Sequence, residues 1–217
     1  MQELAPSILA ADYKILIEQL EIMKENKVEI LHIDLMDGQF VPNFAFGIPM
    51  IEYIRHKTDF ILDVHLMIQE PKRFVQCVRA AGADMITVHV EACEDIMDTL
   101  NTIKSVGAKA GVALCPETSE MLITDEILDK SDSIHFMSVA PGVSNQNFIE
   151  HTLKKIENIK NVIAKKNKSV IIEVDGGINA MNIEAVCKAG ADIIVCGTAL
   201  FQGNLEDNIL YLKNKMK

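Results

Sequence analysis

Short apolar runs alternate with longer segments of helical spacing along the whole chain. Seven of the eight apolar runs are followed by such a segment, and the chain also ends in one. Alternating strands and helices indicate parallel pairing through crossover helices, and strands rich in Ile, Val and Leu are covered on both faces. The expected strands are 4–9, 29–35, 60–66, 85–90, 109–114, 133–139, 170–174 and 192–197.

Eight such units within 217 residues favour one closed (β/α)8 TIM barrel over an open sheet. No linker, low-complexity tract or second domain interrupts the pattern, so residues 1–217 are predicted to form a single catalytic domain.

Two boundary signals support this division of the chain. Pro71 suits the first turn of a helix over 71–81, and Gly82 suits the position that follows its end. The tetrapeptide AGAD occurs at 81–84 and again at 189–192, before the fourth and the eighth strand. This repeat has two interpretations: a duplicated half-barrel, or a turn that joins helix to strand well.

Composition narrows the class of protein. A formal net charge of -10 argues against an electrostatic nucleic-acid binder. The five cysteines are scattered and include no C-x-x-C pair, which is typical of reduced thiols in a cytoplasmic protein. The N-terminus lacks the basic region of a signal peptide, and no uncharged run is long enough for a membrane helix. We therefore expect a cytoplasmic location and neither nucleic acid nor membrane as partner.

Candidate metal ligands lie near the ends of three predicted strands. They are His32 and Asp34 in the second strand, His65 in the third, and Asp175 at the end of the seventh. Side chains alternate along a strand, so His32 and Asp34 face the same way, and the carboxyl ends of barrel strands meet at one mouth. Imidazole and carboxylate together suit one divalent ion of Zn, Fe, Mn or Co, and are less typical of Mg or Ca.

The two carboxylates also suggest a reaction. Asp34 and Asp175 belong to strands well apart in the barrel and could approach a substrate from opposite sides. Such a pair can exchange the proton of a carbon beside a carbonyl between its two faces, while a metal stabilises the enediolate. Either aspartate alone could instead cap a helix or support a ligand.

Glycine-containing loops after the last three strands predict a phosphate site. The segments are 141–145, Gly176-Gly177 and Gly197-Thr198. Loops at this place in a barrel commonly hold a phosphate through backbone N–H groups, and glycine permits close approach. Each pair alone would be an ordinary turn signal.

The chain resembles the ribulose-phosphate 3-epimerase family from Ala5-Pro6-Ser7 to 197–201. The most specific stretches are HIDLMDGQFVPNFAFG (32–47), LDVHLMIQEP (62–71), AGADMITVHVEA (81–92), MSVAPG (137–142) and EVDGGI (173–178). The resemblance implies a metal bound by His32, Asp34, His65 and Asp175, proton transfer by Asp34 and Asp175 at C3 of a ketose phosphate, and a homo-oligomer. It also implies substrate contacts from Ser7, His65, Met36, Met67, Met137, Gly142, Ser144, Asn145, Gly176, Gly177, Gly197 and Thr198.

The chain departs from the family pattern after the sixth strand. Family members usually read NPGFGGQ there, whereas this chain reads APGVSNQ at 140–146, so Ser144 and Asn145 replace two glycines. Asn tolerates a left-handed backbone and Ser can donate a hydrogen bond, which keeps a phosphate site possible. His89 and Glu91 are expected to support the site without binding the metal.

The leading hypothesis is a metal-dependent 3-epimerase of D-ribulose 5-phosphate and D-xylulose 5-phosphate. Its nearest alternative acts on D-allulose 6-phosphate or another ketose phosphate. A phosphate-barrel decarboxylase is disfavoured because DLMDG (34–38) contains no lysine. A non-catalytic sugar-phosphate binder is disfavoured because binding alone does not need both carboxylates.

Overall fold

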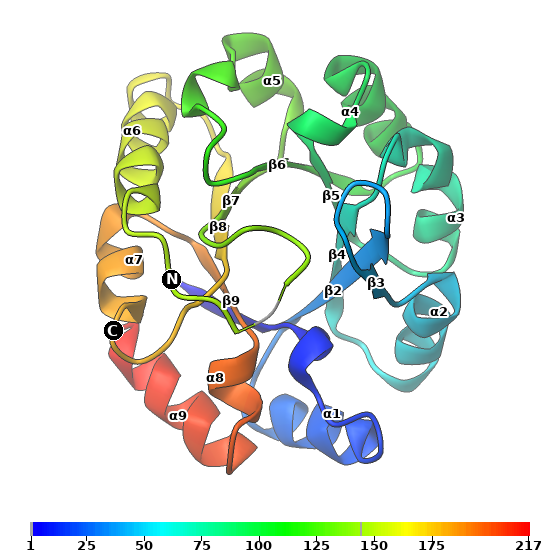
Figure 1. The fold of residues 1–217 in the computed structure, drawn as a ribbon, viewed down its shortest axis with the longest axis vertical. Helices are drawn as coiled ribbons and strands as arrows, with labels where there is room; N and C mark the ends of the chain where they lie inside the picture. The colour runs from blue at the N-terminus through cyan, green and yellow to red at the C-terminus, as the bar shows by residue number, and fades with distance from the viewer. Residues whose placement is uncertain (1, 144) are drawn as a thin grey trace.

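The computed structural model describes residues 2–143 and 145–217. Eight parallel strands form a ring with helices outside it, which is the predicted (β/α)8 barrel (Figure 1). A parallel bridge between Ser7 and His32 joins the first strand to the second and closes the ring. The ring strands are β1 (Glu3–Pro6), β2 (Ile30–Asp37), β4 (Ile61–Met67), β5 (Met85–His89), β6 (Lys109–Leu114), β7 (Ser133–Met137), β8 (Ile171–Asp175) and β9 (Ile193–Cys196).

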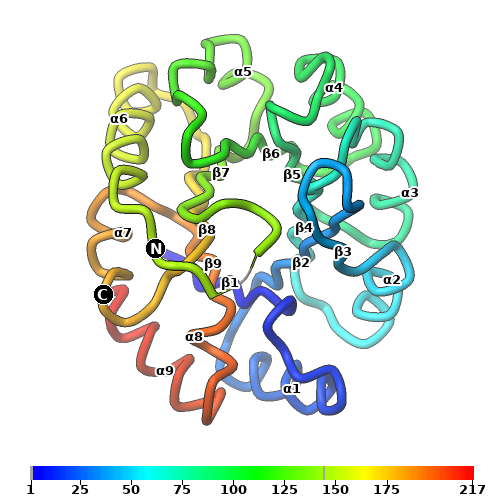
Figure 2. The backbone as a smooth tube through the Cα atoms, in the orientation of Figure 1, coloured from blue at the N-terminus to red at the C-terminus, as the bar shows by residue number. Residues whose placement is uncertain are grey.

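The helices lie around the outside of the ring, as the backbone trace also shows (Figure 2). The α-helices are α1 (Leu16–Glu25), α2 (Ile48–Lys57), α3 (Val75–Ala80), α4 (Ile96–Ser105), α5 (Asp125–Lys130), α6 (Thr152–Lys165), α7 (Ile183–Ala189), α8 (Thr198–Phe201) and α9 (Leu205–Lys215). The 3-10 helices are η1 (Ile8–Ala10), η2 (Pro71–Phe74), η3 (Val90–Ala92) and η4 (Glu120–Leu122). In the described part of the chain, no helix has the length and apolar character needed to cross a membrane.

Two local expectations need correction, and one short strand was not expected. The first strand ends at Pro6, because Ser7 is the N-cap of η1 and its hydroxyl accepts from the N–H of Leu9. The helix expected over 71–81 starts as the 3-10 helix η2 and becomes α-helical only at α3. A short strand, β3 (Phe44–Ala45), pairs antiparallel with the end of β2 and was not predicted.

The interior of the ring is apolar where the strands begin and polar towards their carboxyl ends. Alternation turns Ile30, His32, Asp34 and Met36 of β2 to one side. An apolar cluster that includes Ala5, Ile30, Met85, Ile193 and Val195 occupies the inside at the start of the strands. The larger apolar cluster packs the other strand face against the helices. The ring therefore places its ionisable side chains beyond an apolar floor, towards the carboxyl ends of the strands.

An aspartate precedes every second strand of the ring from β5 onwards. Asp84, Asp132 and Asp192 each accept the N–H of the second residue of the preceding strand, at 3.0, 2.7 and 2.9 Å. Each also pairs with a cation of a neighbouring helix, namely Arg55, Lys104 or Lys160. Asp132 makes the same bonds without the AGAD tetrapeptide, so the turn interpretation explains the repeat without a half-barrel duplication.

Candidate active site

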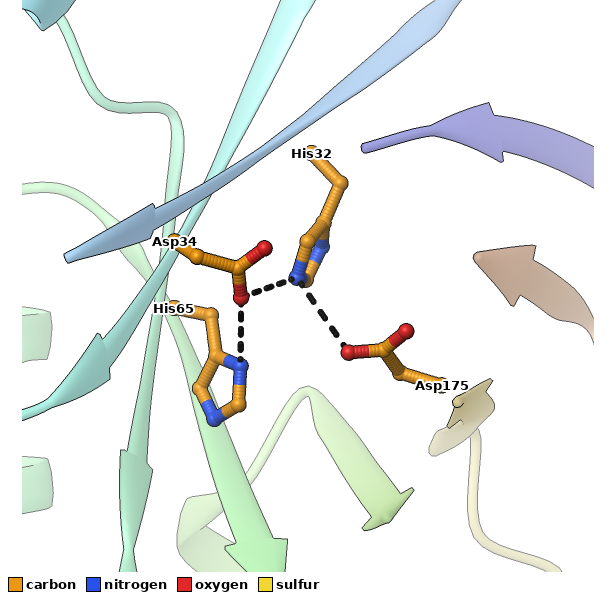
Figure 3. Close-up of side chains that lie close together, drawn as sticks. All are labelled: His32, Asp34, His65 and Asp175. Atoms are coloured by element: carbon orange, nitrogen blue, oxygen red, sulfur yellow. Dashed lines mark hydrogen bonds and ion pairs between the residues drawn. The ribbon is translucent and has the colours of Figure 1, made fainter. Parts of the chain in front are cut away.

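The four predicted metal ligands meet at one point inside the barrel mouth (Figure 3). One ligand atom from each of His32, Asp34, His65 and Asp175 lies within 4.8 Å of all the others. The strand register produces this convergence, because Asp34 of β2 pairs with His65 of β4, and Asp175 ends β8. Strands β1 and β9 lie between β2 and β8 in the ring, so the two carboxylates enter from different directions.

Distances within the cluster are those of a compact polar centre. Oδ1 of Asp34 lies 3.3 Å from Nε2 of His32 and 3.2 Å from Nδ1 of His65. Oδ2 of Asp175 lies 3.9 Å from Nε2 of His32. The hydroxyl of Ser7 donates to Oδ2 of Asp34 at 2.9 Å. Both imidazoles are fully buried, whereas the carboxylate of Asp175 is 16% exposed.

The donor and acceptor pattern fits a cation at this centre. Nδ1 of His32 lies 2.6 Å from the buried carboxylate of Asp63, which fixes the ring proton on that nitrogen in neutral imidazole. Nε2 of His32 is then a bare acceptor, and it has no hydrogen-bond partner among the described residues. It faces the carboxylates of Asp34 and Asp175, so acceptors converge where a divalent ion would bind. Imidazole and carboxylate ligands suit Zn, Fe, Mn or Co.

The same acceptors shift one another's pKa values in the protein alone. Burial lowers the pKa of His32, but the charges of Asp34 and Asp63 outweigh burial and raise it well above its usual value. Burial raises the pKa of Asp34, but the charge of His32 and its hydrogen bond outweigh burial and lower the pKa. Burial, together with the charge of Asp34, raises the pKa of Asp175 to about 8. Protons on His32 and Asp175 therefore compensate the negative charge that a metal would otherwise neutralise.

A cavity opens beside this cluster at the mouth of the barrel. Its walls include Asp34, Asp175 and ten of the residues expected to contact substrate. Those ten are Ser7, Met36, Met67, Met137, Gly142, Asn145, Gly176, Gly177, Gly197 and Thr198. His65 lies in the ligand cluster beside the cavity, and Ser144 lies outside the described residues.

Methionines and glycines form much of the cavity wall. Met36, Met67 and Met137 are almost completely buried and line the cavity between the ligand cluster and its mouth. A second hollow, lined by Gly177, Asn179, Thr198 and Gln202 among others, continues from the first. None of the described residues that line either hollow is a lysine or arginine.

The described residues of the altered loop after β7 lie over the centre of the ring (Figures 1 and 2). Asn145 adopts φ of 60°, as expected from the tolerance of Asn for a left-handed backbone. The amide of Gln146 donates to the carbonyls of Ala140 and Val143 at 2.7 and 2.8 Å, and Asn43 donates to the carbonyl of Gly142 at 2.8 Å. Gln146, which the sequence analysis did not single out, braces this loop.

The fold requires glycine at position 177. Its φ is 65°, and a Cβ atom there would lie 2.7 Å from the nitrogen of Phe148 and 2.8 Å from the carbonyl oxygen of Gln146. The turn after β8 thus packs directly against the loop after β7. Glycine at this position shapes the cavity wall.

Sequence reasoning did not single out two buried ionisable residues beneath the cluster. Glu173 and His135 are fully buried, and Nδ1 of His135 lies 3.4 Å from Oε2 of Glu173. Glu173 also lies 3.3 Å from Nδ1 of His32. Both residues stand two positions before a cavity residue, Asp175 and Met137 respectively, so strand alternation is the signal that could have found them.

Comparison with known proteins agrees with this architecture. Solved barrels that share the fold include a 3-hexulose-6-phosphate synthase (TM-score 0.72, 18% identity, all of both chains). Another is the phosphoribosyl anthranilate isomerase of Thermus thermophilus (TM-score 0.70, 12% identity, 99% of this chain and 98% of that one). At such identities the likeness concerns the fold alone.

Sequence relatives are much nearer. The ribulose-phosphate 3-epimerase of Bacillus subtilis is 42% identical over 93% of both chains. That of Aquifex aeolicus is 42% identical over 93% of this chain and 90% of its own. The chloroplastic ribulose-5-phosphate-3-epimerase of Arabidopsis thaliana is 43% identical over 91% of this chain and 70% of its own. The model of the ribulose-phosphate 3 epimerase family matches residues 3–201, and the chain belongs to that family.

Proposed function

We propose that this protein is a metal-dependent 3-epimerase that interconverts D-ribulose 5-phosphate and D-xylulose 5-phosphate. The observation that carries the proposal is the placement of Asp34 and Asp175, which reach one cavity from separate strands. A substrate carbon between them would present one face to each carboxylate. One carboxylate can then remove the C3 proton while the other supplies a proton to the opposite face.

His32, Asp34, His65 and Asp175 would hold one divalent ion of Zn, Fe, Mn or Co. When bound, the ion would supply positive charge beside the substrate oxygens that become negative as the proton leaves. Ser7 would keep Asp34 oriented through its hydrogen bond. The methionine walls would keep water from the reacting carbon, because they present no hydrogen-bonding group comparable to a hydroxyl or an amide.

The phosphate end of the substrate would lie among Gly142, Asn145, Gly176-Gly177 and Gly197-Thr198, with Ser144 as the remaining predicted contact. The N–H of Thr198 opens the short helix α8 and has no partner within that helix. Backbone N–H groups and the Thr198 hydroxyl would bind the phosphate, since no cation lines the described walls.

The alternative substrate, D-allulose 6-phosphate, is not favoured. Two relatives that are 42% identical to this chain over 93% of its length carry the name ribulose-phosphate 3-epimerase. A single catalytic domain over 1–217, a cytoplasmic location and a homo-oligomer remain predictions that accompany the proposal.

A substrate panel tests the proposal. The metal-free protein should be incubated separately with Zn, Fe, Mn and Co and assayed on five- and six-carbon ketose phosphates and on unphosphorylated D-ribulose. We expect the highest kcat/KM with D-ribulose 5-phosphate and dependence on added metal. A preference for D-allulose 6-phosphate would establish the alternative, and full activity without metal would refute the metal site.

A further inference from the structure

A chain of three side chains extends from His65 away from the cavity. Nε2 of His65 lies 2.9 Å from Nε2 of His89, and Nδ1 of His89 lies 3.1 Å from Oε2 of Glu91. Both imidazoles are fully buried and their rings stack with centroids 4.9 Å apart. The chain connects the ligand cluster with the rim of the barrel, where the carboxylate of Glu91 is 24% exposed.

The carboxylate of Glu91 is held as an acceptor at both oxygens. Oε1 accepts the backbone N–H of Cys115 at 2.8 Å, while Oε2 faces His89. Burial opposes the charge of Glu91, but hydrogen bonds from His89, Thr118 and Cys115 outweigh it and lower its pKa to about 2. Lys155 donates to the carbonyls of Cys115, Pro116 and Thr118, which fixes the loop that carries these donors.

These contacts determine which nitrogen of each neutral ring carries the proton. An acceptor at Glu91 requires the proton of His89 on Nδ1, which leaves Nε2 of His89 bare. The bare nitrogen accepts from Nε2 of His65, so the proton of His65 lies on Nε2. Nδ1 of His65 is then free where it faces Asp34 at 3.2 Å (Figure 3).

We infer that Glu91 and His89 are positioning residues that select the tautomer of His65 and keep its Nδ1 free to bind the metal. In His32 the tautomer is set by one direct contact: Asp63 holds the proton on Nδ1 and leaves Nε2 free for the metal. Partners of this kind orient metal-binding imidazoles and raise their basicity. The inference rests on the divalent ion of the proposed function.

Metal affinity is the first measurement, made by chelator competition on metal-free protein titrated with Zn and with Mn. Glu91→Gln keeps the size of the side chain but replaces one of the two acceptor oxygens with an NH2 donor. That donor must face either His89 or the N–H of Cys115, so one of the two hydrogen bonds is lost. We expect Glu91→Gln and Glu91→Ala to bind either metal roughly 10- to 100-fold more weakly, the usual effect of losing such a partner. Glu117→Gln removes an equal charge from an exposed site on the neighbouring loop and should bind as the wild type does.

Excess metal separates positioning from a folding defect. At saturating metal the Glu91 variants should recover a turnover within about threefold of the wild type, because their catalytic carboxylates are unchanged. A misfolded variant would stay inactive at every metal concentration. If both variants bind metal as tightly as the wild type does, the inference is wrong while the proposed function stands. If the wild type binds no divalent ion, the metal site of the proposed function fails first.

Imidazole nitrogen NMR on metal-free protein with labelled histidine tests the tautomer without any metal. The wild type should show the proton of His65 on Nε2 and that of His89 on Nδ1. Glu91→Ala should move the His65 proton towards Nδ1, where Asp34 can accept it. A wild-type His65 protonated on Nδ1 would overturn the inference.

Discussion

At the scale of single residues, alternation and a shared position at strand ends indicated which side chains would form the ligand cluster. His32 and Asp34 share a face of β2, and His65 of β4 lies at the level of Asp34 because these residues are register partners. The sequence shows which side chains share a face but not how neighbouring strands are offset. For that reason the contacts of His135 and Glu173 beneath the cluster could not be predicted, although the alternation itself was visible.

The two-base assignment predicts the behaviour of Asp175→Asn. The amide keeps the shape of the side chain but cannot accept a proton, so turnover should fall by roughly a hundredfold or more. Steady-state rates on D-ribulose 5-phosphate at saturating metal provide the measurement, with metal content determined on the same samples. The exposed Asp59→Asn is a matched control and should keep its rate. Normal epimerisation by metal-loaded Asp175→Asn would remove Asp175 from the reaction.

Raised pKa values predict how metal affinity depends on pH. Protonated Asp175 (pKa about 8) and protonated His32 must lose their protons to act as ligands. Below the pKa of such a group, its proton competes with the metal for the ligand atom. Metal affinity should therefore rise from about pH 6 to about pH 8, and metal binding should release protons. Calorimetry in buffers with different ionisation enthalpies measures this release. Affinity independent of pH over that range would contradict the protonation pattern.

At the scale of elements, the strands were predicted well because apolar runs bounded by polar segments mark buried parallel strands. Seven of the expected strand centres needed no change, but the first strand stops early because Ser7 caps a 3-10 helix. The two-residue strand β3 has no apolar run of its own, since Phe44 is exposed, and depends on pairing with β2. Tertiary pairing of that kind is not visible in a local pattern.

The aspartates before β5, β7 and β9 should stabilise the fold through their bonds to strand N–H groups. Asp192→Ala would leave the buried N–H of Ile172 without its acceptor, at a cost of about 1–3 kcal/mol. Urea unfolding of the metal-free protein measures the change in free energy of unfolding. Asp59→Ala, whose carboxylate is almost fully exposed, should change it by less than about 0.5 kcal/mol. Equal effects of the two substitutions would show that the turn contact contributes nothing.

Gly177 should affect substrate binding more than turnover. Gly177→Ala pushes a Cβ atom against the backbone of Gln146 and Phe148 and displaces the loop that covers the cavity. We expect a KM for D-ribulose 5-phosphate raised by roughly tenfold or more, because one or two phosphate contacts of about 1 kcal/mol each would be lost. Gly203→Ala has a similar left-handed φ of 88° but open space around it, so it carries the backbone strain alone. The KM of Gly203→Ala should stay unchanged. An equal rise in KM in both variants would show that backbone strain, and not the displaced loop, causes the effect.

At the scale of the whole molecule, a protein with a net charge of -10 must bind an anionic sugar phosphate. The fold reconciles the two by building the predicted phosphate end of the cavity from backbone and hydroxyl groups. Length and the repeating strand–helix pattern were sufficient to predict the barrel. Its closure also depends on the pairing of β1 with β9, a contact between distant parts of the chain that no local pattern contains.

Solvent deuterium incorporation tests the central claim most directly. The metal-loaded wild type should convert D-ribulose 5-phosphate in D2O into D-xylulose 5-phosphate that carries deuterium at C3, because the carboxylate that supplies the new proton exchanges with solvent. Proton NMR of the isolated product reads the position and extent of labelling. Deuterium at C3 of the product, lost in metal-free protein and in Asp175→Asn, is the predicted result. Product that retains protium at C3, or labelling that persists in Asp175→Asn, would contradict two-base epimerisation by this barrel.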